Sequence, residues 1–359
     1  MRQRIQWIDI AKGIAILAVV IGHTLGPYSG KFFGSLIFAF HMPIFFILSG
    51  YLFRMHPINQ EAKRGAMNLL LPYLATGVLI LMINTVALAL PHQPVLNKYF
   101  LNLWQGVQSI VYGAGSLVFN PWHWQIQPIG AIWFLLSMFI AIQLFNGVMH
   151  LTVNLNRWQF TVRLFIVCSL TVLGGELGQL VYLPWAFNAA LFSQLFLYAG
   201  YIVKQTGLIH KMTLPWYLLL AFMWLVSAFQ GYFSLTVPVS PNLLISALGG
   251  ISGSLCVIRF SSWLSQYQGT MLINLLERYG RLSLVVLCFH LIDLDVIGVE
   301  PWVFARVLPL VGPVVATLIS IGYRLAFVTF WVFVIPYLPL LRNCFLPRQY
   351  PFRLKKTVN

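Results

Sequence analysis

Charged residues are scarce in this sequence. Lys, Arg, Asp and Glu make up 8% of the 359 residues, and only seven of them are acidic, whereas soluble domains carry about a quarter. Apolar residues reach 59%, with a mean hydropathy of +0.82. This composition excludes a water-soluble enzyme, a disordered chain and a coiled coil, and it predicts that most of the surface faces lipid.

Cysteine is scarce as well. Three of the four cysteines lie in apolar stretches, and neither a CxxC pair nor a Cys/His ligand spacing occurs; the four are Cys168, Cys256, Cys288 and Cys344. The sequence therefore predicts neither disulfides nor a metal site.

The few charges are mostly positive, with a net charge of +15. In a soluble protein this excess would indicate nucleic acid, but in a membrane protein it reports topology, because cytoplasmic loops collect Lys and Arg. We therefore expect no nucleic-acid partner.

Apolar stretches of about 20 residues predict membrane-spanning helices. We place ten, near residues 9–28, 33–53, 69–90, 129–150, 163–182, 185–203, 214–235, 242–259, 282–299 and 311–337. Residues 303–341 fit one span or two, and Gly312-Pro313 favours one by resembling a helix start. Arg324 lies within that span, where an arginine either pairs with an acid or marks a helix break.

The basic residues orient these spans. With the N-terminus inside, 17 of the 22 Lys and Arg fall on inner loops, three on outer loops and two within spans. This distribution predicts an all-α polytopic membrane protein with both termini cytoplasmic. We expect one integral-membrane domain over residues 1–345 and a basic cytoplasmic tail over 346–359.

The long outer connection, residues 91–128, is predicted to be ordered because it is rich in aromatics. Part of it, near 98–119, fits an amphipathic helix lying on the outer leaflet. Trp122 and Trp124 fit either an aromatic belt at the membrane interface or a platform for stacking a sugar ring.

The first span carries three ionisable residues, Asp9, Lys12 and His23. Lys12 and His23 are eleven residues apart, so the two side chains share one helix face about 16 Å apart along the axis. Asp9 precedes Lys12 by three residues and is predicted to pair with it. A snorkelling lysine with a core histidine is the structural alternative, but the combination favours a functional channel with a cation at its inner mouth and a base deeper inside.

The second span contributes His41, a predicted kink at Pro43, and Ser49-Gly50-Tyr51. A basic loop follows, from Arg54 to Arg64, and contains Lys63. Kinking and packing alone would also explain the residues within this span.

These motifs resemble the membrane acyltransferases of the acyltransferase-3 type, which include sugar and cell-wall O-acetyltransferases. The resemblance rests on Ile8-Asp9…Lys12-Gly13…Gly22-His23, His41-Met42-Pro43, Ser49-Gly50-Tyr51, Leu70-Leu71-Pro72-Tyr73, Ile132-Trp133-Phe134-Leu135, Phe196-Leu197-Tyr198-Ala199-Gly200-Tyr201 and Gly280-Arg281-Leu282-Ser283…His290. It implies a bundle of about ten helices and makes His23, which follows the basic Lys12 after ten intervening residues, the catalytic histidine. It also implies a cytosolic acyl-coenzyme A as donor and a hydroxyl of a surface glycan, glycolipid or wall component as acceptor. Some members carry an Arg-x-x-Arg pair after the second span, where this chain has only Lys63-Arg64.

Such a transfer needs a base, because a neutral alcohol is a poor nucleophile, and His23 is expected to act as that base or to carry the acyl group itself. Candidate partners of His23 are Trp133, His41 and His290. We expect Lys12, Arg54, Lys63 and Arg64 to bind the coenzyme phosphates. The remaining candidates lining the active site are Ser49, Tyr51, Glu176, Trp122 and Trp124, with Glu176 equally compatible with a plain interfacial position.

No permanently bound cofactor is expected. The expected partners are acyl-coenzyme A, with acetyl as the acyl group, a glycan or glycolipid acceptor and the lipid bilayer of a bacterial plasma membrane; a homo-oligomer is compatible with the sequence. The alternative function is a transporter or flippase for a glycolipid or small acid, which also requires buried charges.

Overall fold

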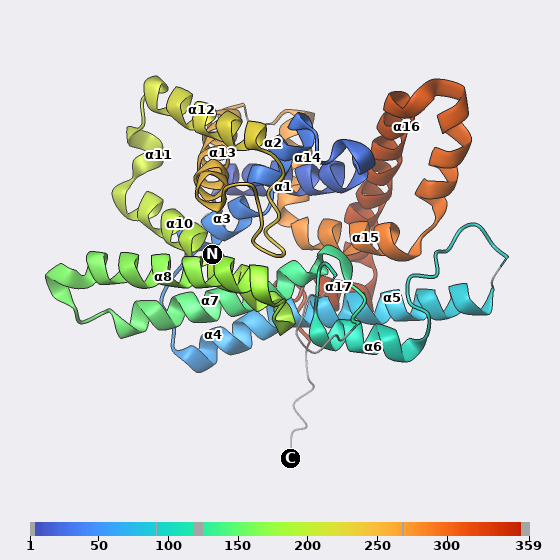
Figure 1. The fold of residues 1–359 in the computed structure, drawn as a ribbon, viewed down its shortest axis with the longest axis horizontal. Coiled ribbons are helices and arrows are strands. Elements are labelled where there is room, and N and C mark those ends of the chain that lie inside the picture. Colours follow the sequence, from blue (N-terminus) through green and yellow to red (C-terminus); the bar gives the residue numbers. More distant parts are fainter. Residues whose placement is uncertain (1–3, 91, 118–124, 268, 353–359) are drawn as a thin grey trace, which may run out of the picture.

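The computed structural model describes residues 4–90, 92–117, 125–267 and 269–352. Over these ranges the chain is all-helical, as predicted, and β-structure is limited to two isolated bridges (Figure 1). The helices are α1 (Gln6–Thr24), α2 (Phe32–Phe40), α3 (Pro43–Leu52), α4 (Ile58–Gly65), α5 (Leu71–Ala89), α6 (Leu103–Tyr112), α7 (Trp133–Leu151), α8 (Gln159–Leu180), α9 (Phe187–Phe192), α10 (Gln194–Thr206), α11 (Leu208–Lys211), α12 (Leu214–Gln230), α13 (Leu243–Leu264), α14 (Met271–Arg281), α15 (Ser283–Val296), α16 (Val299–Val334) and α17 (Pro339–Phe345).

Seven helical segments are long and apolar enough to cross a membrane, and the bent pair Pro184–Phe192 and Gln194–Thr206, which meet at 45°, makes an eighth. Each of the ten predicted spans coincides with helix. Two of them, α12 with 17 residues and α15 with 14, are shorter than the roughly 20 residues of a usual crossing. The chain therefore has the helices of a multi-pass membrane protein, while the number of ten crossings stays a prediction.

Two predicted helix breaks are present. The second span divides into α2 and α3 around His41 and Met42, and Pro43 opens α3, where a missing N–H is tolerated. In α16 the backbone leaves helical geometry at Gly312, with φ 77° and ψ 170°, and the ribbon turns back there (Figure 1). The predicted span 311–337 thus corresponds to the part of α16 that begins at Pro313.

The predicted helix within residues 98–119 is α6, which packs against α5. The Tyr73 hydroxyl donates to the Ile110 carbonyl at 2.6 Å. The Asn84 side chain accepts the backbone N–H groups of Tyr99 and Phe100 and donates to the Phe100 carbonyl. The long connection is therefore ordered at its start, as its aromatic content predicts.

Helix α1 lies at the centre of the molecule and contacts α2, α3, α13, α14, α15 and α16. Eleven of its 19 residues are buried. Because its neighbours come from both ends of the chain, α1 brings residues that are far apart in sequence around Lys12 and His23.

Candidate functional site

A cavity of about 530 Å³ opens beside the first half of α1. Helices α1, α3, α4, α7, α14, α15 and α17 line it, together with the π-helical segment Ala66–Leu70 and residues 346–349 after α17. One end of the cavity is rich in arginine, and the other is apolar. We call these the charged end and the apolar end.

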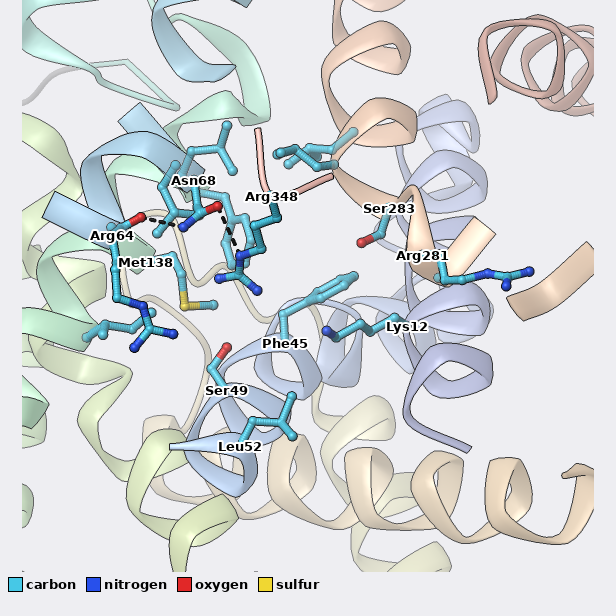
Figure 2. Close-up of a pocket in the computed structure, with 18 of the residues that line it drawn as sticks. Lys12, Phe45, Ser49, Leu52, Arg64, Asn68, Met138, Arg281, Ser283 and Arg348 are labelled. Atoms are coloured by element: carbon cyan, nitrogen blue, oxygen red, sulfur yellow. Dashed lines mark hydrogen bonds between the residues drawn. The ribbon is translucent and has the colours of Figure 1, made fainter. Parts of the chain in front are cut away.

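The charged end contains most of the predicted donor-binding residues. Lys12, Arg54 and Arg64 line the cavity, whereas Lys63, the fourth predicted residue, is not part of its lining. Figure 2 shows Lys12 reaching into the cavity from one side and Arg64 lying across from it. Arg64 also forms an ion pair with Glu61 at 3.5 Å.

The prediction that Asp9 pairs with Lys12 is wrong. The ion pair of Asp9 is with Arg4, at 3.6 Å. Arg4 precedes α1, so its long side chain can fold back over the first helical turn, while Lys12 extends toward the cavity (Figure 2). Both Asp9 and Lys12 nevertheless line the cavity.

The apolar end is built from apolar side chains of α1, α3, α7 and α15 and of Met42, which immediately precedes α3. The helical residues are Ile16 and Val19 of α1, Phe45 of α3, Phe134, Leu135 and Met138 of α7, and Leu284 and Leu287 of α15. Val19 lies one helical turn before His23, so this end of the cavity approaches the histidine along α1. His23 itself does not line the cavity, but its side chain is partly exposed.

Three histidines meet beyond the apolar end. The ring centroid of His23 lies 5.8 Å from that of His290 and 6.3 Å from that of His41. His41 Nδ1 donates to the Ile37 carbonyl at 3.2 Å. His290 is fully buried, and neither of its ring nitrogens has a partner within the described residues. The structure therefore brings together the catalytic candidate and two of its three predicted partners.

Two reciprocal glycine contacts hold the helices that carry this site. A Cβ on Gly13 of α1 would lie 2.1 Å from the Leu276 carbonyl oxygen of α14, and one on Gly280 would lie 1.7 Å from the Asp9 carbonyl oxygen. Gly50 of α3 and Gly200 of α10 make a second such contact. Only glycine permits backbones to approach this closely, so the motifs Lys12-Gly13 and Ser49-Gly50 combine a cavity residue with a packing residue.

The other predicted site residues are more dispersed. Ser49 lines the cavity, but Tyr51 does not: its ring meets Trp7 edge-on at 5.2 Å. Trp133 is buried against Gly115 and is likewise outside the cavity lining. Glu176 is exposed on α8. Trp122 and Trp124 lie outside the described residues.

Of the two roles predicted for Arg324, pairing with an acid or marking a helix break, the structure shows the pairing. Its Nη2 donates to Glu300 at 2.8 Å, and its Nε lies 3.7 Å from Asp293. The Tyr323 hydroxyl donates to the same Asp293 at 2.9 Å. Asp293 follows His290 by one helical turn on α15, so this buried charge cluster adjoins the three histidines.

Sequence reasoning missed several polar residues of the cavity, namely Arg4, His56, Glu61, Asn68, Arg348 and Gln349. Arg281 and Ser283 also line it and had served only as parts of the family motif. Arg281 and Ser283 stand at the junction of α14 and α15, where the Gly280 motif places them. Arg348 lies 58 residues beyond His290, the nearest predicted site residue in the sequence, and carries no local signal.

Comparisons with known proteins indicate the family to which the chain belongs. The family model of the acyltransferase-3 type, described as an acyltransferase domain, matches residues 5–338. A curated relative, the nodulation protein NolL of Mesorhizobium japonicum, is 30% identical over 146 residues. That alignment covers 37% of this chain and 33% of the relative, so the chain matches about a third of NolL's length. No solved structure matches. The match over nearly the whole chain places this protein in the acyltransferase-3 family of membrane acyltransferases.

Proposed function

We propose that this protein transfers an acyl group, expected to be acetyl, from cytosolic acyl-coenzyme A to a hydroxyl of an extracytoplasmic glycan, glycolipid or cell-wall component. The observation that carries the proposal is the cavity along α1, with cations at one end and His23 one turn beyond the other. A donor with a phosphorylated end and a reactive thioester at the far end matches this polarity.

In the proposed reaction His23 removes the proton of the acceptor hydroxyl as its oxygen attacks the thioester carbonyl. The tetrahedral intermediate then collapses, the carbon–sulfur bond breaks, and the departing thiolate takes the proton from His23. The products are an ester and free coenzyme A. General base catalysis of this kind contributes about 10²–10⁴ in rate. Transfer through an acyl-histidine is the alternative route with the same products.

His290 and His41 support this role by position. Because His41 donates to a backbone carbonyl through Nδ1, its ring is held in place. The ring centroid of His290 lies 5.8 Å from that of His23, and within the described residues neither ring nitrogen of His290 has a partner, so His290 can offer a hydrogen bond close to His23.

We also infer ten membrane crossings with both termini in the cytoplasm of a bacterial cell. The predicted sidedness supports this, because it places the charged end of the cavity on the inner face, where acyl-coenzyme A is available.

The first test is His23→Ala in the purified protein, assayed by thiol release from acetyl-coenzyme A with cell-envelope glycans as acceptor. We expect transfer to fall to background while the thermal unfolding midpoint and coenzyme binding stay close to wild type. The matched control is His92→Ala, an exposed histidine that is not part of the cavity lining, which should retain full activity. Full activity in His23→Ala would refute the catalytic role, and acceptor movement without thiol release would favour the transporter.

A further inference from the structure

The segment after α17, Leu346–Tyr350, folds back onto the cavity and is called here the C-terminal strap. The backbone N–H groups of Gln349 and Tyr350 both donate to the Leu346 carbonyl at 2.9 Å. Leu346 is buried, and the Arg342 guanidinium lies 4.7 Å from the centroid of the Tyr350 ring. The strap is thus a packed turn that belongs to the cavity.

Arg348 projects from this turn into the charged end. Its Nε donates to Asn68 Oδ1 at 3.0 Å, and Asn68 Nδ2 donates to the Arg64 carbonyl at 2.5 Å (Figure 2). Asn68 therefore links the strap to the segment that carries Arg64. Within the described residues the two terminal nitrogens of Arg348 have no protein partner, so up to four N–H donors stay available.

The charges around Arg348 are unbalanced. Arg64 is paired with Glu61, whereas Arg348 has no carboxylate within 4.0 Å among the described residues. Desolvation by the surrounding chain, and next the positive charge of Arg64, lower the pKa of Arg348 from its ordinary value. Two guanidinium groups and Lys12 around one cavity, with few acids to balance them, form a site for an anion.

We propose that Arg348 of the C-terminal strap, together with Arg64 and Lys12, binds the phosphate groups at the nucleotide end of the acyl-coenzyme A donor. The inference rests on the proposed function, because it takes the donor from it. It makes the C-terminal strap part of the donor site, and it assigns to Arg348 a bidentate phosphate contact of the kind for which guanidinium is suited.

The test measures binding, independently of catalysis. Full-length protein in zwitterionic lipid nanodiscs is titrated calorimetrically with coenzyme A and with pantetheine, which lacks the phosphates. Arg348→Gln should weaken coenzyme A binding about ten- to a hundredfold, as expected for losing a hydrogen bond to a charged group, and leave pantetheine binding unchanged. The control is Arg157→Gln, an exposed arginine outside the cavity, which should bind both ligands like wild type.

Three outcomes would overturn the inference. Wild-type affinity for coenzyme A in Arg348→Gln would do so and leave the role of His23 intact. Equal loss of coenzyme A and pantetheine binding would give Arg348 a structural role. Displacement of coenzyme A by anionic lipid in wild type, but not in Arg348→Gln, would assign the site to a lipid head group. Failure of wild type to bind coenzyme A at all would refute the proposed donor instead.

Discussion

At the scale of single residues, the buried ion pairs of Arg324 connect α16 to α15. Arg324 is 4% exposed and Asp293 is 1% exposed, so the charge of Asp293 depends on Arg324 for compensation, and that of Arg324 depends on Asp293 and Glu300. The pairing sits one turn from His290 and helps to fix the helix that carries it.

Replacing this arginine should therefore be severe. Arg324→Met leaves the buried carboxylate of Asp293 and the partly exposed carboxylate of Glu300 without their cation, and we expect a loss of about 3–5 kcal/mol, measured as a lower unfolding midpoint in detergent. Arg306→Gln is the control, because Arg306 is exposed and only stacks on Trp302. A midpoint for Arg324→Met equal to that of the control would contradict the assignment.

Glycine substitutions test the close helix contacts. In Gly200→Ala the new Cβ would lie 1.9 Å from the Ile47 carbonyl oxygen, so α3 and α10 must separate; we expect a destabilisation of about 1–3 kcal/mol. The same change at Gly322, which has no atom within 4 Å of its Cβ position, should be neutral or mildly stabilising. Thermal loss of the monodisperse fraction in detergent measures both, and equal midpoints would disprove the contact.

The part of the candidate site that lies on a single helix could be predicted from the sequence. The spacing from Lys12 to His23 fixes their shared face through helix geometry alone. The nearness of His41 and His290 to His23 required tertiary packing, although their residue type marked them as candidates. Arg348 lies in an irregular turn, where no periodic pattern exists to signal a role, and the partner of Asp9 depended on how a single long side chain folds.

At the scale of elements, the helical segments follow from apolar length, and the breaks at Pro43 and Gly312 follow from backbone chemistry. The number of crossings does not follow, because α12 and α15 are too short for length to decide. The helix α6 was predictable in kind, but its contact with α5 through Tyr73 and Ile110, and the anchoring of the preceding residues by Asn84, depend on tertiary packing.

Asn84 should therefore control the order of the long connection. Asn84→Leu removes the acceptor for two backbone N–H groups and the donor to one carbonyl, which we expect to cost about 1–3 kcal/mol locally. Hydrogen exchange of residues 98–102 should accelerate, while the exposed control Asn154→Leu leaves it unchanged. Unaltered protection in Asn84→Leu would show that aromatic packing alone orders the segment.

At the scale of the whole molecule, the asymmetry of basic residues makes a topological prediction. In a variant without the four native cysteines, Lys63→Cys should react with a membrane-impermeant maleimide only after the cells are permeabilised. Lys98→Cys should react in intact cells. Labelling of both positions in intact cells would contradict the orientation and, with it, donor entry from the cytosol.

The continuous helix α1 fixes the distance between Lys12 and His23, and this distance bears on the length of the donor in the proposed function. Lys12 and His23 lie on one continuous helix. The distance between them is therefore fixed by the helix and does not change when loops move. Inserting one alanine between them would advance His23 by about 1.5 Å and swing it by about 100° around the axis. If the proposed function holds, we expect that a donor of different length can be accommodated only by changes of about a whole helical turn between the two residues, because such changes keep both side chains on one face.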